Sequence, residues 1–292
     1  MIFKINKRKF NYLIFALIFL LLFMLFSILI RKINSPKINP NLMYVHYINV
    51  DQGDSILIQK NNKNLLIDSG PKSHKKQLFK FLKSLDISTL DYVIATHPHD
   101  DHIGNMNSII NSYKINSFYA PKVYSNTKSF ELMIDALKSK NLKIHTIKRD
   151  CNTITLGEDI QVQVLSPISD SYDNENNYSP VIKITFGNTS FLFTGDAESE
   201  VENQLLSLND NLQADVLKIG HHGSSTSTSD NFLSKVNPKY AVISVGKNNI
   251  YGHPNKDILL KLKNSNINVL RTDKLNNITF ISDGVNIGYS HS

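Results

Sequence analysis

Four residues with metal-ligand side chains lie within six positions of the sequence, at His97, His99, Asp101 and His102. They follow an apolar run at 92–95 that is typical of a buried strand. In a loop leaving a sheet, His97 and His99 can point to one metal ion while Asp101 and His102 turn toward a second ion. Three imidazoles and a carboxylate suit zinc or manganese, so we expect metal-assisted hydrolysis at this loop.

Two further polar turns also follow apolar runs. Asp196 comes after the run at 190–193 in a Thr-Gly-Asp turn, where its carboxylate can reach into a cleft above the sheet and bridge two ions. The alternative interpretation is that Asp196 caps a helix expected over 197–208. His221 and His222 follow the run at 214–219. Since adjacent side chains diverge in an extended segment, we expect one to bind metal and the other to face the leaving group. We favour His221 as the ligand and His222 as the proton donor, and the reverse assignment stays open.

The elements that must position these residues are short. Runs rich in Val, Ile, Tyr and Phe, separated by Asn, Asp and Gly turns, predict strands. We expect strands at 43–50, 55–59, 65–67, 92–95, 115–120, 143–148, 160–165, 181–186, 189–194, 214–219, 240–245 and 267–271, with a closing hairpin at 277–289. Helices are expected at 72–85, 127–140, 197–208 and near 256–264. Interleaved strands and helices favour one α/β domain of two sheets packed face to face with helices outside.

An uncharged and almost wholly apolar segment at 12–30 precedes this domain. As a helix it would be about 28 Å long, which matches the hydrocarbon core of a bilayer. It ends in Ile30-Arg31-Lys32 without a small-residue cleavage site, so an uncleaved transmembrane anchor is favoured over a signal peptide.

The predicted organisation therefore has four parts: a basic cytoplasmic tail at 1–11, the anchor at 12–30, a tether at 31–42 and the folded domain at 43–292. Four basic residues precede the apolar segment and three follow it closely. This weak asymmetry favours a single-pass protein in the cell membrane with its folded domain extracellular.

Composition narrows the possible functions further. The net charge is +7, but residues 1–37 contain seven Lys and Arg and no acidic residue, so the remaining 25 basic and 25 acidic residues balance. This balance does not support a broad nucleic-acid footprint on the domain. The single cysteine, Cys151, excludes an intrachain disulfide, a Cys-rich zinc ribbon and an iron–sulfur site. Any metal must be held by His, Asp and Glu.

The motif at 96–104, THPHDDHIG, resembles the H-x-H-x-D-H signature of the metallo-β-lactamase superfamily. Segments 49–55 (NVDQGDS) and 66–70 (LIDSG) look like the opening of the hydrolase domain of ComEC-type competence proteins and of a related cell-wall phosphorylcholine esterase. The resemblance covers about 44–290 and includes FTGD at 193–196, LKIGHHGS at 217–224 and YGHP at 251–254.

The resemblance implies a four-layer αββα sandwich that carries two divalent metal ions, Zn or Mn. It adds His253, otherwise a plain loop histidine, to the ligands. Asp68 is better placed to orient a ligand histidine than to bind metal, and Asp54 is similar, with a structural turn as the alternative. The expected metal ligands are His97, His99, Asp101, His102, Asp196, His221 and His253. The expected catalytic residues are Asp101 and Asp196, which hold the attacking water, and His222.

One departure from the family makes the second ion uncertain. Many members supply another ligand histidine between Asp101 and Asp196, and the sole candidate here, His145, lies far from the expected turn. Either the pair His221 and His222 fills that place or one metal is loosely held.

The resemblance implies a membrane-anchored phosphodiesterase or nuclease acting on DNA strands or on phosphorylated wall polymers. Two other classes remain open: an accessory of DNA uptake that binds strands without cutting them, and a non-catalytic scaffold. The ligand set disfavours the scaffold because it is nearly complete. The sequence carries no sign of antibiotic recognition and indicates no oligomeric state.

Overall fold

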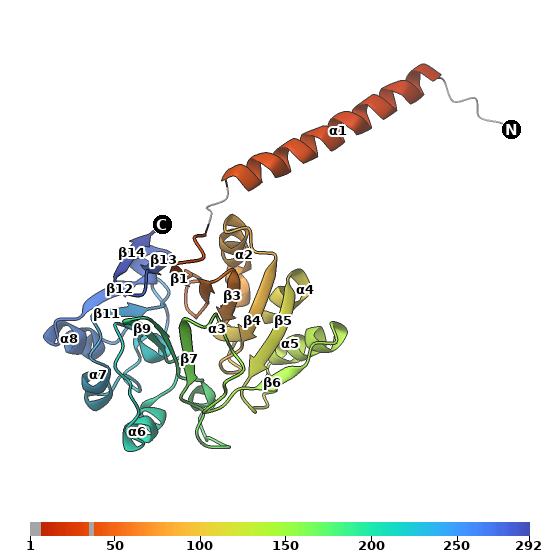
Figure 1. Cartoon of the computed structure of the whole chain (residues 1–292). Coiled ribbons are helices and arrows are strands. Elements are labelled where there is room, and N and C mark those ends of the chain that lie inside the picture. Colours follow the sequence, from red (N-terminus) through yellow and green to blue (C-terminus); the bar gives the residue numbers. More distant parts are fainter. Residues whose placement is uncertain (1–6, 35–37) are drawn as a thin grey trace. The chain divides into compact units, whose positions relative to one another are not determined.

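The computed structural model describes residues 7–34 and 38–292, and within the first helix it describes the side chains at position 8 and positions 11–26. The chain forms two compact units. One comprises residues 82–87 and the described residues before position 38, and the other comprises residues 38–81 and 88–292 (Figure 1).

Helix α1 (Lys7–Asn34) contains the apolar segment at 12–30. Its large apolar side chains from Tyr12 to Phe26 are exposed. Within the described residues, however, no helix combines the length and the apolar character that crossing a membrane requires. The transmembrane helix predicted at 12–30 is therefore not found, although the side chains at 27–30 lie outside the described residues. So do residues 1–6 of the predicted tail and 35–37 of the predicted tether.

The larger sheet has the strand order β14-β13-β1-β2-β3-β4-β5-β6. Strands β3 to β6 run parallel, and the other neighbours pair antiparallel. The bounds are β1 (Met43–Tyr47), β2 (Ile56–Lys60), β3 (Lys63–Ile67), β4 (Thr89–Ile94), β5 (Lys114–Ala120), β6 (Ile144–Thr146), β13 (Ile278–Ser282) and β14 (Ile287–His291).

The smaller sheet has the order β12-β11-β10-β9-β8-β7. Strands β9 to β12 are parallel to one another. Strand β8 pairs antiparallel with both of its neighbours, β7 and β9. The bounds are β7 (Ile160–Val164), β8 (Ile182–Phe186), β9 (Thr189–Phe193), β10 (Val216–Lys218), β11 (Tyr240–Ile243) and β12 (Asn268–Arg271).

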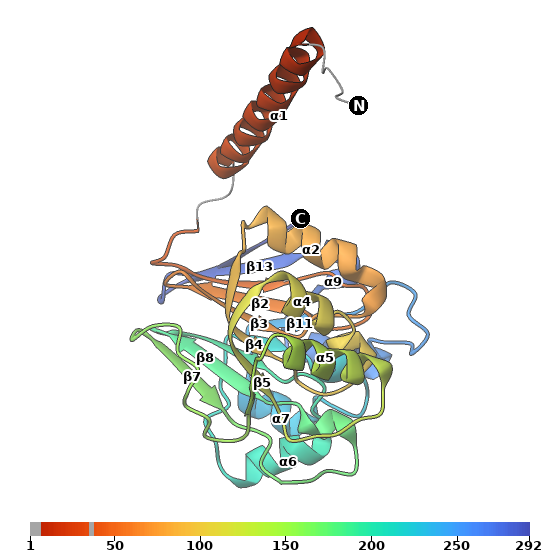
Figure 2. The ribbon, with the colours of Figure 1, turned by 90° about the vertical axis from the view of Figure 1, so that its right-hand side faces the viewer.

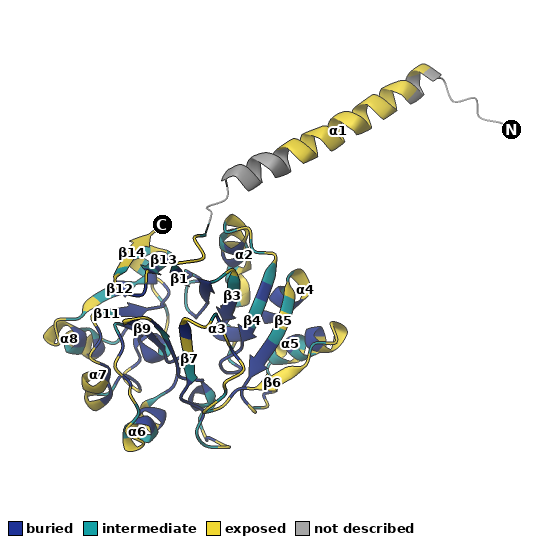
Figure 3. Ribbon diagram, in the orientation of Figure 1, coloured by how far each residue is buried: buried dark blue, intermediate teal, exposed yellow. Residues whose placement is uncertain are grey.

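Alternation along the strands builds two apolar layers. On β9, Phe191 and Phe193 pack in the core between the sheets with residues such as Tyr47. Leu192, between them in sequence, belongs to the second core, which the smaller sheet shares with helix residues such as Val201. Because side chains alternate faces along a strand, both faces of this sheet are buried and its strands read as nearly continuous apolar runs. Figure 3 shows the strands mostly buried and the outer faces of the helices exposed.

Helices cover both outer faces of the sandwich, with α4 and α5 on the larger sheet and α6, α7 and α8 on the smaller one (Figures 1 and 2). The bounds are α2 (Lys75–Ser84), α3 (Asp100–Ile103), α4 (Met106–Ser112), α5 (Lys128–Ser139), α6 (Ser199–Ser207), α7 (Asp230–Val236), α8 (Lys256–Asn264) and α9 (Thr272–Leu275). The predicted two-sheet α/β sandwich with outer helices is confirmed. The sequence analysis missed α3, α4, α7 and α9, which are too short to show a clear helical period.

Candidate metal centre

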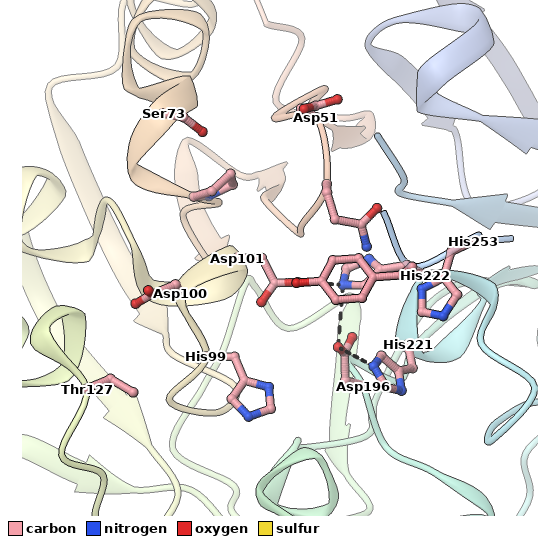
Figure 4. A pocket seen from close by; sticks show the side chains of 13 residues that line it. Asp51, Ser73, His99, Asp100, Asp101, Thr127, Asp196, His221, His222 and His253 are labelled. Carbon is pink, nitrogen blue, oxygen red and sulfur yellow. Dashed lines mark ion pairs between the residues drawn. The ribbon is translucent and has the colours of Figure 1, made fainter. Parts of the chain in front are cut away.

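The candidate site lies where several strands end. Loops that leave the carboxyl ends of β4, β9, β10 and β11 carry His97, Asp196, His222 and Ser244, respectively. Strands β9 to β11 are parallel, so their loops leave one edge of the smaller sheet, and the loop after β4 of the larger sheet meets them at one cleft. The cleft has a volume of about 610 Å³ (Figure 4), and its lining residues are Asp51, Gln52, Pro71, Ser73, His99, Asp100, Asp101, Thr127, Asp196, His221, His222, Tyr251 and His253.

The histidine cluster after β4 was expected to lie in a loop, but part of it is helical. His99 takes the extended N-cap position of α3, and Asp101 and His102 lie in its single turn. The turn buries His102 completely, while Asp101 keeps 29% of its side-chain surface exposed at the cleft. One helical turn therefore exposes Asp101 at the cleft and buries its neighbour His102.

Four of the predicted residues, Asp101, His102, Asp196 and His222, place one ligand atom each within 4.8 Å of one another. Asp196 Oδ2 lies 3.2 Å from His102 Nε2 and 3.4 Å from His222 Nε2. His222 Nε2 also lies 3.3 Å from Asp101 Oδ2. Two imidazole nitrogens and two carboxylate oxygens thus face a common point.

The charges in this group act strongly on one another. Burial alone would lower the pKa of His222, but Asp196, Asp101 and Asp54 raise it to about 10. Burial would also lower the pKa of His102, but the charges of Asp196, Asp101 and Asp68 raise it. Burial raises the pKa of Asp196, yet the charges of His102 and His222 outweigh it and the net shift is downward. The carboxylates therefore favour positive charge at this point, which is the condition for attracting a divalent cation.

An unsatisfied atom supports the same interpretation. Asp196 Oδ1 is buried and finds no hydrogen-bond partner among the described residues. A buried carboxylate oxygen without a partner is costly, so such an atom needs an explanation such as an ion. The donor set of imidazole nitrogen and carboxylate oxygen fits zinc or manganese.

Buried partners fix the orientation of the ligand histidines. Asp68 Oδ2 lies 2.8 Å from His102 Nδ1, and Asp68 also accepts hydrogen bonds from the Thr96 N–H and hydroxyl. His222 Nδ1 donates to the Ser244 carbonyl oxygen at 2.8 Å, because a carbonyl can only accept. In both rings the partner occupies Nδ1 and leaves Nε2 directed at Asp196.

His97 and His99 lie next to this group. His97 is buried, and its Nε2 lies 3.9 Å from Asp196 Oδ2 and 3.0 Å from His99 Nδ1. Burial and the neighbouring His102 lower the pKa of His97. His99 Nε2 lies 3.2 Å from Glu175 Oε2. Glu175 begins a short 3₁₀ turn (Glu175–Tyr178), which lies between Asp101 and Asp196 in the sequence. An acidic residue therefore lies beside His99 on the chain segment where many superfamily members supply a histidine.

His221 and His253 lie together on the wall of the cleft, with ring centroids 5.5 Å apart. His221 Nε2 lies 3.8 Å from Asp196 Oδ2, and its Nδ1 lies 3.1 Å from Glu198 Oε1. His253 Nδ1 is buried with no hydrogen-bond partner in the described part of the chain. Figure 4 shows His221 beside Asp196 and His222. Seven ligands were predicted, and all of them lie in or beside one site. Three of them, Asp101, His102 and Asp196, belong to its tightest group, whose fourth member is His222.

A profile of the metallo-beta-lactamase superfamily matches residues 48–247, more than half of the chain. The chain belongs to this superfamily. Its sandwich of two sheets and the strand-end position of its histidines agree with the sequence motifs that predicted the family.

Curated relatives of this superfamily member include one that is named for competence. "ComE operon protein 3" of Bacillus subtilis (strain 168) is 34% identical over 254 residues, which cover 81% of this chain and 32% of that protein. "Competence protein ComA" of Neisseria gonorrhoeae is 28% identical over 226 residues, covering 76% of this chain and 30% of that protein. The chain thus spans about a third of the length of the curated relatives it matches.

Among solved structures, the metallo-beta-lactamase fold protein YhfI from Bacillus subtilis matches with a TM-score of 0.53 at 14% identity. The match covers 85% of this chain and 99% of that one. At this identity the likeness shows the shared fold alone.

Within the superfamily fold, Asp54 has a partner that the sequence analysis did not anticipate. Asp54 Oδ2 lies 2.9 Å from Lys218 Nζ, and both side chains are buried. Asp54 Oδ1 lies 3.8 Å from His222 Nδ1, farther than the Ser244 carbonyl that orients that ring. The signal for this pair was present in the sequence, because Lys218 interrupts the apolar run at 214–219.

Glu198 and Glu175 were also missed. Each contacts a histidine of the site, but in the sequence both lie among polar residues where nothing distinguishes them from solvent-exposed acids. Only the fold brings Glu175 to His99 and Glu198 to His221.

Proposed function

We propose that this superfamily hydrolase is a metal-dependent phosphodiesterase or nuclease. The observation that carries the proposal is the convergence of Asp101, His102, Asp196 and His222 at the base of an open cleft. These residues would hold the first divalent ion, zinc or manganese. When bound, the ion supplies Lewis-acid stabilisation of the charge that develops on a phosphoryl group.

We assign His222 to the ligands, in place of the His221 assignment favoured by the sequence analysis. The expectation that the two side chains diverge assumed an extended segment. Instead they lie in a tight turn (Gly220–Gly223) in which both residues have positive φ, 46° and 54°. This turn buries His222 against Ser244 and leaves His221 partly exposed at the cleft. His221, oriented by Glu198, is then the residue placed to give a proton to a leaving group.

The second ion remains part of the proposal. His97, His99 and Asp196 would hold it, with Glu175 or His253 completing the set. Asp196 is the residue common to both groups, since Oδ2 faces His102 and His222 and also lies within 4 Å of His97 and His221. Asp101 and Asp196 would then hold the attacking water, which donates hydrogen bonds to their carboxylates.

The charge of the cleft distinguishes this function from metal-independent DNA binding. Asp51, Asp100, Asp101 and Asp196 all line the cleft. Such a surface repels a polyanion unless bound cations neutralise it. It therefore disfavours an accessory that binds DNA without metal.

The substrate class rests on two further observations. The curated relatives include a protein named for competence, which favours a nucleic acid over a wall polymer. Tyr251 lines the cleft with 63% of its surface exposed, and its ring stacks against His253 at 5.8 Å between centroids. An exposed aromatic ring beside the reacting centre is the kind of surface on which an unpaired base stacks. Phosphorylated wall polymers remain the alternative substrate.

The test is cleavage by the purified full chain of a single-stranded oligonucleotide, a generic phosphodiester and a phosphorylated wall polymer. Mn²⁺ or Zn²⁺ is added to protein that has been stripped with a chelator. We expect cleavage that requires the metal and is lost in His102→Ala and Asp196→Asn. His145→Ala, which changes an exposed histidine on β6 away from the cleft, serves as the control. Full cleavage in either site variant, or in the stripped protein, would refute the proposal.

Membrane attachment through residues 12–30, with an extracellular domain on a single span, stays a prediction. The exposed apolar side chains of α1 support it. Expression of the full chain and of a variant without residues 1–37, followed by alkaline washing of membranes, tests it. Attachment predicts that only the full chain stays in the membrane pellet.

A further inference from the structure

Lys218 is a fully buried lysine at the end of β10, next to the metal centre. Its Nζ lies 2.9 Å from Asp54 Oδ2. It also donates to the carbonyl oxygens of Ile219 at 2.9 Å and Gly195 at 3.4 Å. A lysine ammonium has three donors and no acceptor, so these three contacts use its full hydrogen-bonding capacity.

Each contact reaches a different segment of the site. Gly195 directly precedes Asp196, and Ile219 directly precedes the turn that carries His222. The Asp54 backbone N–H donates to the Asp101 carbonyl oxygen at 3.2 Å. One ammonium group therefore contacts the two loops that present Asp196 and His222, and reaches the turn that presents Asp101 through Asp54.

Burying a charged side chain at position 218 carries a large desolvation penalty. The other residues of this strand and its exit, including Val216, Leu217 and Ile219, are fully buried and apolar. Desolvation of a buried ammonium and carboxylate offsets much of their attraction, so an apolar side chain would stabilise a strand at least as well. Because burying this charge does little to stabilise the fold, we look for another role of Lys218.

We propose that Lys218 is a positioning residue of the metal centre. By holding two backbone carbonyls and Asp54 on one nitrogen, it sets the spacing of Asp101, Asp196 and His222 before a cation binds. Ligands held at their binding distances need less ordering when the ion arrives, so affinity increases. This inference rests on the proposed metal-dependent function.

The test measures Mn²⁺ binding by the full chain with titration calorimetry, independently of catalysis. Partners outside the ligand set typically change metal affinity about 10–100-fold when lost. We expect the Mn²⁺ dissociation constant of Lys218→Met to rise by at least about tenfold. Its paramagnetic resonance spectrum with bound Mn²⁺ should also change, because the ligand spacing is altered.

A double variant separates positioning from charge balance. Lys218→Met combined with Asp54→Asn buries no charge and so remains able to fold if the single variant does not. Positioning predicts that Mn²⁺ affinity stays at least about tenfold below wild type in this neutral variant. Wild-type affinity in the double variant would overturn the proposal, because Lys218 would then only balance Asp54.

Lys60 provides a matched control. It is also buried, pairs with Asp159 at 2.8 Å and donates to the carbonyl oxygens of Pro40 and Asn41, but it lies away from the cleft. Lys60→Met with Asp159→Asn should keep wild-type Mn²⁺ affinity. An equal loss in both double variants would make the effect a general consequence of removing a buried lysine and its acidic partner and would reject positioning. If the wild-type chain binds no Mn²⁺ at all, the proposed function itself fails.

Discussion

The fully buried side chains of His102 and Asp68 form a pair in which Asp68 Oδ2 lies 2.8 Å from His102 Nδ1. Two bonds from Thr96 hold the carboxylate in place. The pair directs His102 Nε2 toward Asp196, so the orientation of a proposed ligand depends on a residue that cannot itself reach the cleft.

Replacement of Asp68 by Asn should weaken metal binding and leave the fold intact. The amide nitrogen can only donate, so it would face either the Thr96 N–H or His102 Nδ1–H without forming a bond. We expect the Mn²⁺ dissociation constant to rise about 10–100-fold, measured by titration calorimetry. Asp215→Asn is the control, because Asp215 likewise accepts a backbone N–H and a hydroxyl, both from Ser190, but away from the cleft. Unchanged affinity in Asp68→Asn would contradict the role of the pair.

The two adjacent histidines should behave differently when each is replaced by alanine. His222→Ala removes a proposed ligand, so we expect Mn²⁺ affinity to fall further than in Asp68→Asn. His221→Ala should keep most of that affinity and lower kcat by about 10²–10⁴-fold, the range typical of a lost general acid. Calorimetry and single-turnover cleavage of the oligonucleotide measure the two effects. The reverse pattern would restore the assignment favoured by the sequence analysis.

Acid should destabilise the domain through a histidine outside the site. His46 on β1 is buried between Thr279 and Gln59, and burial lowers its pKa to about 4, which the hydrogen bond to Gln59 only partly offsets. The unfolded chain therefore binds a proton at this residue between about pH 6.5 and pH 4 that the folded chain does not. Above about pH 6.5 His46 contributes about 3 kcal/mol to the free energy of unfolding, relative to a pH at which it is protonated in both states. This contribution decreases as the pH falls from about 6.5 to about 4.

Urea unfolding of wild type and His46→Gln at pH 7 and pH 4.5 measures this contribution. We expect a smaller loss of unfolding free energy in the variant, which has no titrating group at this position. The exposed His145→Gln should keep the wild-type dependence. If His46→Gln loses as much stability on acidification as wild type, His46 does not carry the effect.

A base-stacking role for Tyr251 predicts a dependence on the aromatic ring. Stacking of a base on an aromatic side chain contributes about 1–3 kcal/mol, so Tyr251→Leu should raise KM for a single-stranded oligonucleotide about 5- to 150-fold. Tyr251→Phe should stay near wild type, because it keeps the ring. An abasic oligonucleotide of equal length should show no difference between Tyr251→Leu and wild type. Equal losses on both substrates would rule out stacking.

The sequence by itself determined the family, the two-sheet architecture and most of the residues that form the site. Local patterns were sufficient because His97, His99, Asp101 and His102 are close in sequence, and because Asp196 and His222 each follow an apolar run that marks a buried strand. Residues far apart in the sequence could be grouped because the segments that carry them resemble the motifs of one superfamily.

Only the tertiary structure shows how those residues are placed relative to one another. His221 and His222 lie in a turn with positive φ angles, so the rule for extended segments does not apply to them, and our assignment of His222 to the ligands rests on the tertiary structure. The contacts of Lys218, Glu175 and Glu198 join segments from different strands and loops, and no local pattern records them. Long-range contacts of this kind are set by which strands become neighbours, and a single stretch of sequence does not contain that information.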